Sequence, residues 1–249
     1  MVQGPPRGYF LDPTKSILIV SPQNVLRAEA LFWRYGLQVV MGSRYLGGFI
    51  GTETAQDRWM EEKVVGWRDL VATLAGVERW HPQTDSTVLQ KSLHQEWAFV
   101  QHVTPGIGMD FKPVEDELRV TFLPDLFQED TSQILRRAIT GMPFKQAGIA
   151  LPNPIKTSRD NCIASYVITG HLVAALGRTA EFRLGDNSFF MREGREEIQQ
   201  RHAEAAEIAL GEARADASTK DAHRMGRIQR TRAWLSVNPS TVNGKELGA

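Results

Sequence analysis

The chain has 249 residues, of which 42% are hydrophobic and 23% are charged, values close to those of ordinary globular proteins. This composition argues against intrinsic disorder, a collagen-like chain and a heptad-only architecture. Twenty-nine basic residues balance twenty-nine acidic ones, so only a local basic patch could attract nucleic acid or anionic lipid. The single cysteine, Cys162, excludes an internal disulfide, a cysteine-rich zinc site and a CxxC redox pair.

The first fifty residues predict a small α+β unit. Residues 16–20 (SILIV) form a short apolar run and predict a buried strand. Asn24 suits the N-cap of a helix that runs to about Tyr35, and Gly36 suits its C-terminal end. Residues 37–41 predict a second strand, and residues 44–51 (RYLGGFIG) predict a tight hairpin, because the glycine pair permits positive φ. A full sheet is lacking, so we expect this part to be the least well packed.

The chain after Gly51 predicts helices. Apolar residues three and four positions apart indicate helices over about 53–74, 84–103 and 113–127. The apolar stripe predicted for the first of these consists of Trp59, Lys63, Trp67, Leu70, Val71 and Leu74. A Pro- and Gly-rich loop is predicted over 141–160, then a helix over about 161–176 and a long, mostly solvated helix over 190–220. The predicted fold class is therefore α+β at the N-terminus and predominantly α-helical afterwards.

Most sequence signatures of enzymes are missing. The chain has no Gly-rich phosphate-binding motif, no HExxH zinc motif and no GxSxG nucleophile motif. His94 and His102 could share a helix face but have no evident third ligand, and Cys162 is interpreted as a small core residue. The acidic residues 115–117 lie in the first turn of a predicted helix, where the helix dipole accounts for them without a metal. No apolar run reaches the length of a membrane helix, so we expect a soluble, intracellular protein (nuclear or cytoplasmic) without a membrane partner or a small-molecule cofactor.

One basic cluster stands out near the C-terminus. Within nine residues that contain no acidic residue lie four arginines, Arg224, Arg227, Arg230 and Arg232. On a helix the first three share roughly one face, and arginine suits phosphate groups. The cluster is therefore a candidate nucleic-acid-binding surface, and a solvated basic helix face is the alternative interpretation.

Several short motifs, taken in order, resemble the end of a reverse transcriptase palm, in particular that of non-LTR-like retrotransposons. Before the strand over 17–20 come Gly8-Tyr9-Phe10 and Pro13-Thr14-Lys15-Ser16. The hairpin Arg44-Tyr45-Leu46-Gly47-Gly48 resembles the primer grip of that family, and the helices after it resemble the thumb. Residues 145–152 (KQAGIALP) and 233–240 (AWLSVNPS) resemble landmarks beyond the thumb.

The resemblance implies three domains: a palm-end remnant over residues 1–51, a thumb-like helical domain over 52–140, and connection-like loop and helices over 141–249. It implies that Lys15 is the general acid that protonates the leaving pyrophosphate. It also implies that Arg44, Tyr45, Leu46, Gly47 and Gly48 contact an RNA–DNA or DNA duplex through backbone and ring contacts. A solvated turn lysine and an ordinary hairpin are the alternative interpretations of these residues.

The departure from the family concerns the catalytic centre. The paired aspartates of these polymerases, including the Tyr-x-Asp-Asp hairpin, have no counterpart, because the chain contains no adjacent Asp pair. Mg²⁺ would be expected only for an intact polymerase, and DNA synthesis by this chain alone is not expected. We therefore expect a catalytically inactive fragment of a retroelement RNA-directed DNA polymerase. The alternatives are a non-enzymatic, helical nucleic-acid-binding module and a helical protein-interaction domain.

Overall fold

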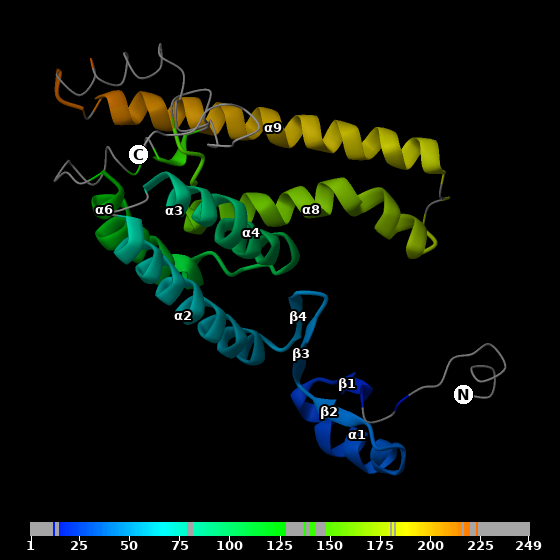
Figure 1. The fold of residues 1–249 in the computed structure, drawn as a ribbon. Coiled ribbons are helices and arrows are strands. Elements are labelled where there is room, and N and C mark those ends of the chain that lie inside the picture. Colours follow the sequence, from blue (N-terminus) through cyan, green and yellow to red (C-terminus); the bar gives the residue numbers. More distant parts are fainter. Residues whose placement is uncertain are drawn as a thin grey trace, which may run out of the picture. The chain divides into compact units, whose positions relative to one another are not determined.

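The computed structural model describes residues 12, 15–78, 82–127, 137, 140–142, 148–179, 181, 183–215, 217–219 and 223. The contacts between residues divide the chain into two compact units, Met1–Lys63 and Val64–Ala249, and each is described by itself (Figure 1). The first unit contains the described strands, and the second is helical. The predicted fold class, α+β at the N-terminus and predominantly α-helical afterwards, is confirmed.

The first unit begins with a parallel β-α-β element. β1 (Ile17–Ile19) pairs with β2 (Gln38–Val40), and Leu18 lies opposite Val39 in the register. α1 (Val25–Phe32) connects the two strands, with a short 3₁₀ turn at each end. Gly36, at φ 65°, ends the second turn in the left-handed region that glycine tolerates. The predicted order of strand, helix and strand is therefore confirmed.

A hairpin and the first part of a long helix complete this unit. β3 (Gly42–Tyr45) and β4 (Gly48–Gly51) are antiparallel, and α2 (Glu53–Glu78) follows. Among the described residues of the first unit, Ala28 and Met60 are the buried hydrophobic side chains, whereas Leu31 and Trp33 are exposed. The sheet of two strands is therefore sparsely covered, which agrees with the expectation from the sequence.

The second unit is built from helices that pack on the C-terminal part of α2. In chain order these are α3 (Pro82–Val88), α4 (His94–Val103), α5 (Lys112–Glu117), α6 (Leu123–Phe127), α8 (Pro154–Leu176) and α9 (Leu184–Ala215). α8 lies against α4 along one side and against α9 along the other (Figure 1). Within the described parts of the chain, no helix is long and apolar enough to cross a membrane.

Two π-helical turns, Leu89–Leu93 and Leu118–Phe122, interrupt the predicted helices over 84–103 and 113–127. Each stretch contains a row of buried apolar residues four positions apart: Leu89, Leu93 and Trp97 in one, and Val114, Leu118 and Phe122 in the other. Four-residue steps drift around an ordinary α-helix, which has 3.6 residues per turn. The wider π-helical turn, with its i→i+5 hydrogen bonds, compensates for the drift and keeps each row of side chains on the core face.

The predicted apolar stripe of α2 is partly wrong. The buried residues of this helix are Met60, Val64, Trp67, Val71 and Ala75, whereas Leu70 is half exposed. Trp67 sets the orientation, because its ring stacks on Phe111 at 5.5 Å and meets the edge of Trp97 at 6.4 Å. The small side chain of Ala75 then faces the core, and the larger Leu70 does not.

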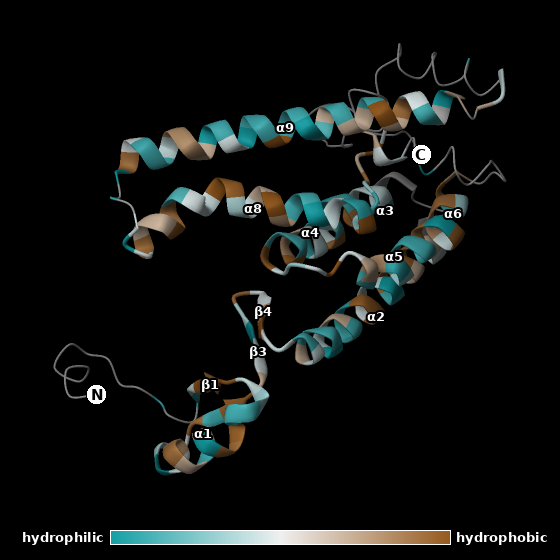
Figure 2. Ribbon diagram, turned by 180° about the vertical axis from the view of Figure 1, so that it is seen from behind, coloured by the Kyte–Doolittle hydropathy of each residue, from teal (hydrophilic) through white to brown (hydrophobic). Residues whose placement is uncertain are grey.

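The boundaries of the last two helices also differ from the prediction. α8 begins at Pro154, seven residues before the predicted Asn161, because Asn153 caps it. The Asn153 side-chain oxygen accepts hydrogen bonds from the backbone N–H groups of Ile155 (2.9 Å) and Lys156 (3.2 Å), an arrangement worth about 1 kcal/mol. α9 begins at Leu184 rather than near residue 190, and hydrophilic residues cover most of its length (Figure 2).

Candidate nucleic-acid interface

The hairpin β3–β4 ends in a two-residue turn with an unusual backbone. Tyr45 pairs with Gly48, and between them Leu46 has φ 46° and Gly47 has φ 85°. Two successive positive φ values are typical of a type I′ turn, whose twist matches that of the strands it joins. Leucine in this region costs about 1–2 kcal/mol relative to a right-handed conformation. Strain of this kind is concentrated at functional sites, so the tip of the hairpin is a candidate site.

Aromatic packing holds the hairpin on the first turns of α2. Phe49, which lies opposite Arg44, stacks on Trp59 with ring centroids 5.5 Å apart. Gly42 leaves room for the Phe49 ring, since a Cβ atom at this position would lie 2.6 Å from it. The orientation of the hairpin therefore depends on Gly42, Phe49 and Trp59, none of which the sequence analysis assigned to the site. The sequence signal that could have identified Gly42 is the pair of glycines that face each other at the open end of the hairpin, since Gly42 lies opposite Gly51.

The side chains at the tip are open to solvent. Tyr45 is 60% exposed and Leu46 is 78% exposed, and the Arg44 side chain is also exposed, whereas Gly48 is buried. An exposed guanidinium can bind phosphate, and an exposed tyrosine ring can stack on a base. The structure thus brings Arg44, Tyr45, Leu46, Gly47 and Gly48 together in one hairpin.

Lys15 lies just before β1, in a short turn. Its ammonium group is 3.5 Å from the carboxylate of Asp12, and its side chain is 84% exposed. The backbone N–H of Lys15 and the hydroxyl of Ser16 both donate to the carbonyl oxygen of Asp12. The described contacts of Lys15 are therefore those of a solvated turn lysine, and none of them joins it to the hairpin.

The four arginines Arg224, Arg227, Arg230 and Arg232 lie outside the described residues. Their assignment to a nucleic-acid-binding surface stays a prediction.

Other candidate groups of the sequence take part in packing. The Nδ1 atom of His102 and the Ser165 hydroxyl form a hydrogen bond of 3.1 Å, and this bond joins α4 to α8. Cys162 is buried, and burial raises the pKa of its thiol, which makes it a poor nucleophile. Over the described part of the chain, no group of three or more His, Cys, Asp or Glu residues could hold a metal ion.

His94 provides a test of this packing role. Burial, together with the smaller effect of the nearby positive charge of Arg137, lowers the pKa of His94 to about 4. In the unfolded chain the ordinary pKa is about 6.5, so the unfolded state binds more protons at acidic pH. We therefore expect the free energy of unfolding to be highest above pH ~6.5 and to fall by up to about 1.4 kcal/mol per pH unit as the pH drops toward 4.

Urea unfolding of the chain and of a His94→Leu variant between neutral and acidic pH measures this effect. The variant should lose this part of the pH dependence, whereas His202→Gln, at an exposed position of α9, should keep it. The same acid sensitivity in all three proteins would show that His94 is not responsible.

Comparisons with known proteins give no family for the chain: no protein-family model, no curated protein and no solved structure matches it.

Proposed function

We propose that the chain binds a nucleic-acid duplex through the tip of the hairpin β3–β4, as a non-catalytic relative of the palm end and thumb of retroelement reverse transcriptases. One observation carries this proposal: an exposed, strained type I′ turn presents Arg44 and Tyr45 next to Leu46 and Gly47 on a hairpin anchored to a helix. Arg44 binds a phosphate of the backbone, and the Tyr45 ring contacts a terminal base or sugar.

Binding to a labelled RNA–DNA hybrid across a salt series tests the proposal. We expect affinity to fall steeply with salt, because phosphate contacts release counterions. Tyr45→Ala should weaken binding by about tenfold, the effect of losing a stacked base. Arg44→Gln should lower the slope of log affinity against log salt by about 1, since one phosphate contact is lost.

Arg27→Gln is the matched control for Arg44→Gln, because Arg27 is an exposed arginine on α1 of the same unit. It removes the same charge away from the hairpin and should leave the salt slope nearly unchanged. Equal effects of the two substitutions, or the absence of binding at low salt, would contradict the proposal. Primer extension by the purified chain with Mg²⁺ and nucleotides would contradict its non-catalytic part.

A second candidate function is protein binding by the first unit, and its exposed apolar side chains favour it. The solvent-exposed ones include Ile17, Leu26, Leu31, Trp33, Tyr35 and Met41. Where such side chains form a contiguous patch, the patch is typical of a protein-interaction site. This function predicts a complex that is insensitive to salt and that Tyr45→Ala leaves intact.

A further inference from the structure

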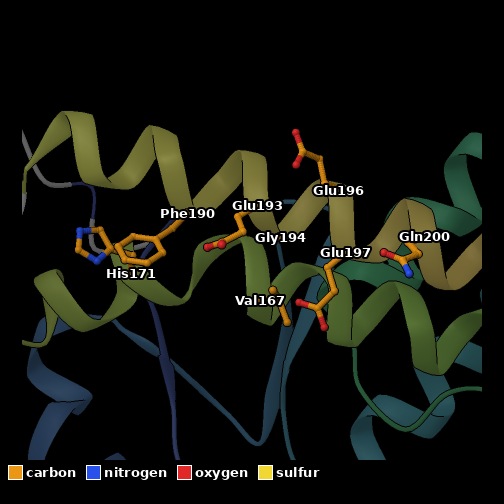
Figure 3. Close-up of a pocket in the computed structure, with 8 residues that line it drawn as sticks. All are labelled: Val167, His171, Phe190, Glu193, Gly194, Glu196, Glu197 and Gln200. Carbon is orange, nitrogen blue, oxygen red and sulfur yellow. The ribbon is translucent and has the colours of Figure 1, made fainter.

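The helices α8 and α9 approach each other closely at one point and leave a groove beside it. A Cβ atom on Gly194 would lie 3.1 Å from a methyl carbon of Val167 and 3.6 Å from Ile168. Next to this contact is an open cavity of about 620 Å³, lined by Val167 and His171 of α8 and by Phe190, Glu193, Gly194, Glu196, Glu197 and Gln200 of α9 (Figure 3). The groove therefore lies entirely within the second unit and does not involve the hairpin.

The groove has an apolar floor. The rings of His171 and Phe190 lie 5.0 Å apart at an angle of 33°, and Val167 continues the apolar surface. Phe190 is 45% exposed and Val167 is 40% exposed, so neither is covered by the described chain. At the same end of the helix pair Leu176 and Leu184 are also exposed. The floor of the groove therefore offers exposed apolar side chains to a partner.

The rim of the groove is acidic. Glu193 and Glu197 extend from α9 toward α8, whereas Glu196 points away from it (Figure 3). Glu197 accepts a hydrogen bond of 2.6 Å from Arg201, one turn further along α9. In the part of the chain that the structure describes, Glu193 and Glu196 form no ion pair. Of the two carboxylates that extend toward α8, Glu193 therefore carries a charge that a cationic partner could neutralise, and Arg201 binds only the Oε1 atom of Glu197.

We propose that this groove binds a basic amphipathic helix of a partner protein, with the apolar face of that helix on Phe190 and Val167 and its cationic side chains on Glu193 and Glu197. A helix that lies in a groove between two helices is a recurrent mode of recognition. The acidic rim disfavours an acidic partner, because like charges would then face each other. The charge of the rim and the apolar floor together select the occupant.

Fluorescence anisotropy with a labelled peptide tests this inference. The probe is a helix-forming peptide of about 18 residues, five turns, with leucine on one face and lysine on the other. We expect saturable binding to the full chain, and a dissociation constant about tenfold higher for the double variant Glu193→Gln/Glu197→Gln, because close charge contacts are lost. Phe190→Gln should weaken binding by a similar factor through loss of the apolar floor.

The matched control is Glu207→Gln/Glu212→Gln, which makes the same charge change at exposed positions of α9 outside the groove. It should change the dissociation constant by less than about twofold, because surface charges beyond a Debye length are largely screened. Equal weakening by both double variants, or equal binding of a peptide with glutamate in place of lysine, would overturn the proposal. Binding that appears only after Arg224, Arg227, Arg230 and Arg232 are all changed to Gln would identify this chain's own basic segment as the occupant and would also overturn it.

Discussion

Replacing Arg137 by Met is expected to lower the free energy of unfolding by about 3–5 kcal/mol, because it leaves the buried carboxylate of Glu115 without its partner. Glu115 is 3% exposed, and its two oxygens accept hydrogen bonds of 2.7 Å from the Nε and Nη2 atoms of Arg137. Nη1 of Arg137 also donates to the Thr140 hydroxyl and to the carbonyl oxygen of Leu151. One guanidinium therefore joins α5 to Thr140 and Leu151.

The control is the exposed pair of Lys112 and Asp116 on the same helix as Glu115. Lys112→Met should cost less than about 1 kcal/mol, as is typical of surface ion pairs. The double variant Glu115→Leu/Arg137→Met should lose less stability than the sum of its two single variants, because neither charge is left buried alone. Urea unfolding followed by circular dichroism measures the unsubstituted chain, the three single variants and the double variant, and additive effects in the double variant would show that the pair is not coupled.

Trp67→Ala is expected to lower the free energy of unfolding by about 3–5 kcal/mol through the loss of buried area and the cavity that remains. Trp67 is 2% exposed and lies parallel to Phe111, with an interplanar angle of 7°. It also meets the edge of Trp97, so its indole contacts two separate segments of the helical unit. Loss of Trp67 should therefore destabilise the packing of α2 against both of them.

Phe99→Ala is the comparison for Trp67→Ala. Phe99 lies on α4 of the same unit but is 47% exposed, and its truncation should cost about 1 kcal/mol or less. The urea midpoints of the two variants, multiplied by the slope of the transition, give the difference between their free energies of unfolding. A Trp67→Ala variant that is as stable as Phe99→Ala would show that the stacked pair of Trp67 and Phe111 does not form in solution.

The element types of this chain follow from local sequence signals, but two details depend on contacts between distant residues. Gly36, the apolar run at 16–20 and the glycines at 47–48 each predict their local conformation, and the structure confirms the turn, the strand and the hairpin. The orientation of α2 depends instead on the contact of Trp67 with Phe111, which is 44 residues away in the sequence. The spacing of apolar residues within α2 does not reveal this contact.

The acidic residues at 115–117 show the same limit. Their position in a first helical turn explains an acidic residue at the surface through the helix dipole. It does not predict that Glu115 is buried against Arg137, because that pairing joins residues 22 positions apart. Similarly, Arg44 and Tyr45 could be assigned to the hairpin from sequence, whereas the anchor of that hairpin on Trp59 could not, since Trp59 also fits a helical apolar stripe.

The π-helical turns at Leu89–Leu93 and Leu118–Phe122 are the places where these helices can lose one residue and keep the same core face. Trp97 follows Leu89 by eight residues, and Phe122 follows Val114 by eight. Eight steps of about 100° leave such a pair about 80° out of alignment on a regular α-helix, whereas seven steps leave it only about 20° out. A one-residue deletion inside either π-helical turn would therefore restore an unbroken α-helix with the same core face. The same deletion elsewhere in these helices would rotate every later core residue toward solvent.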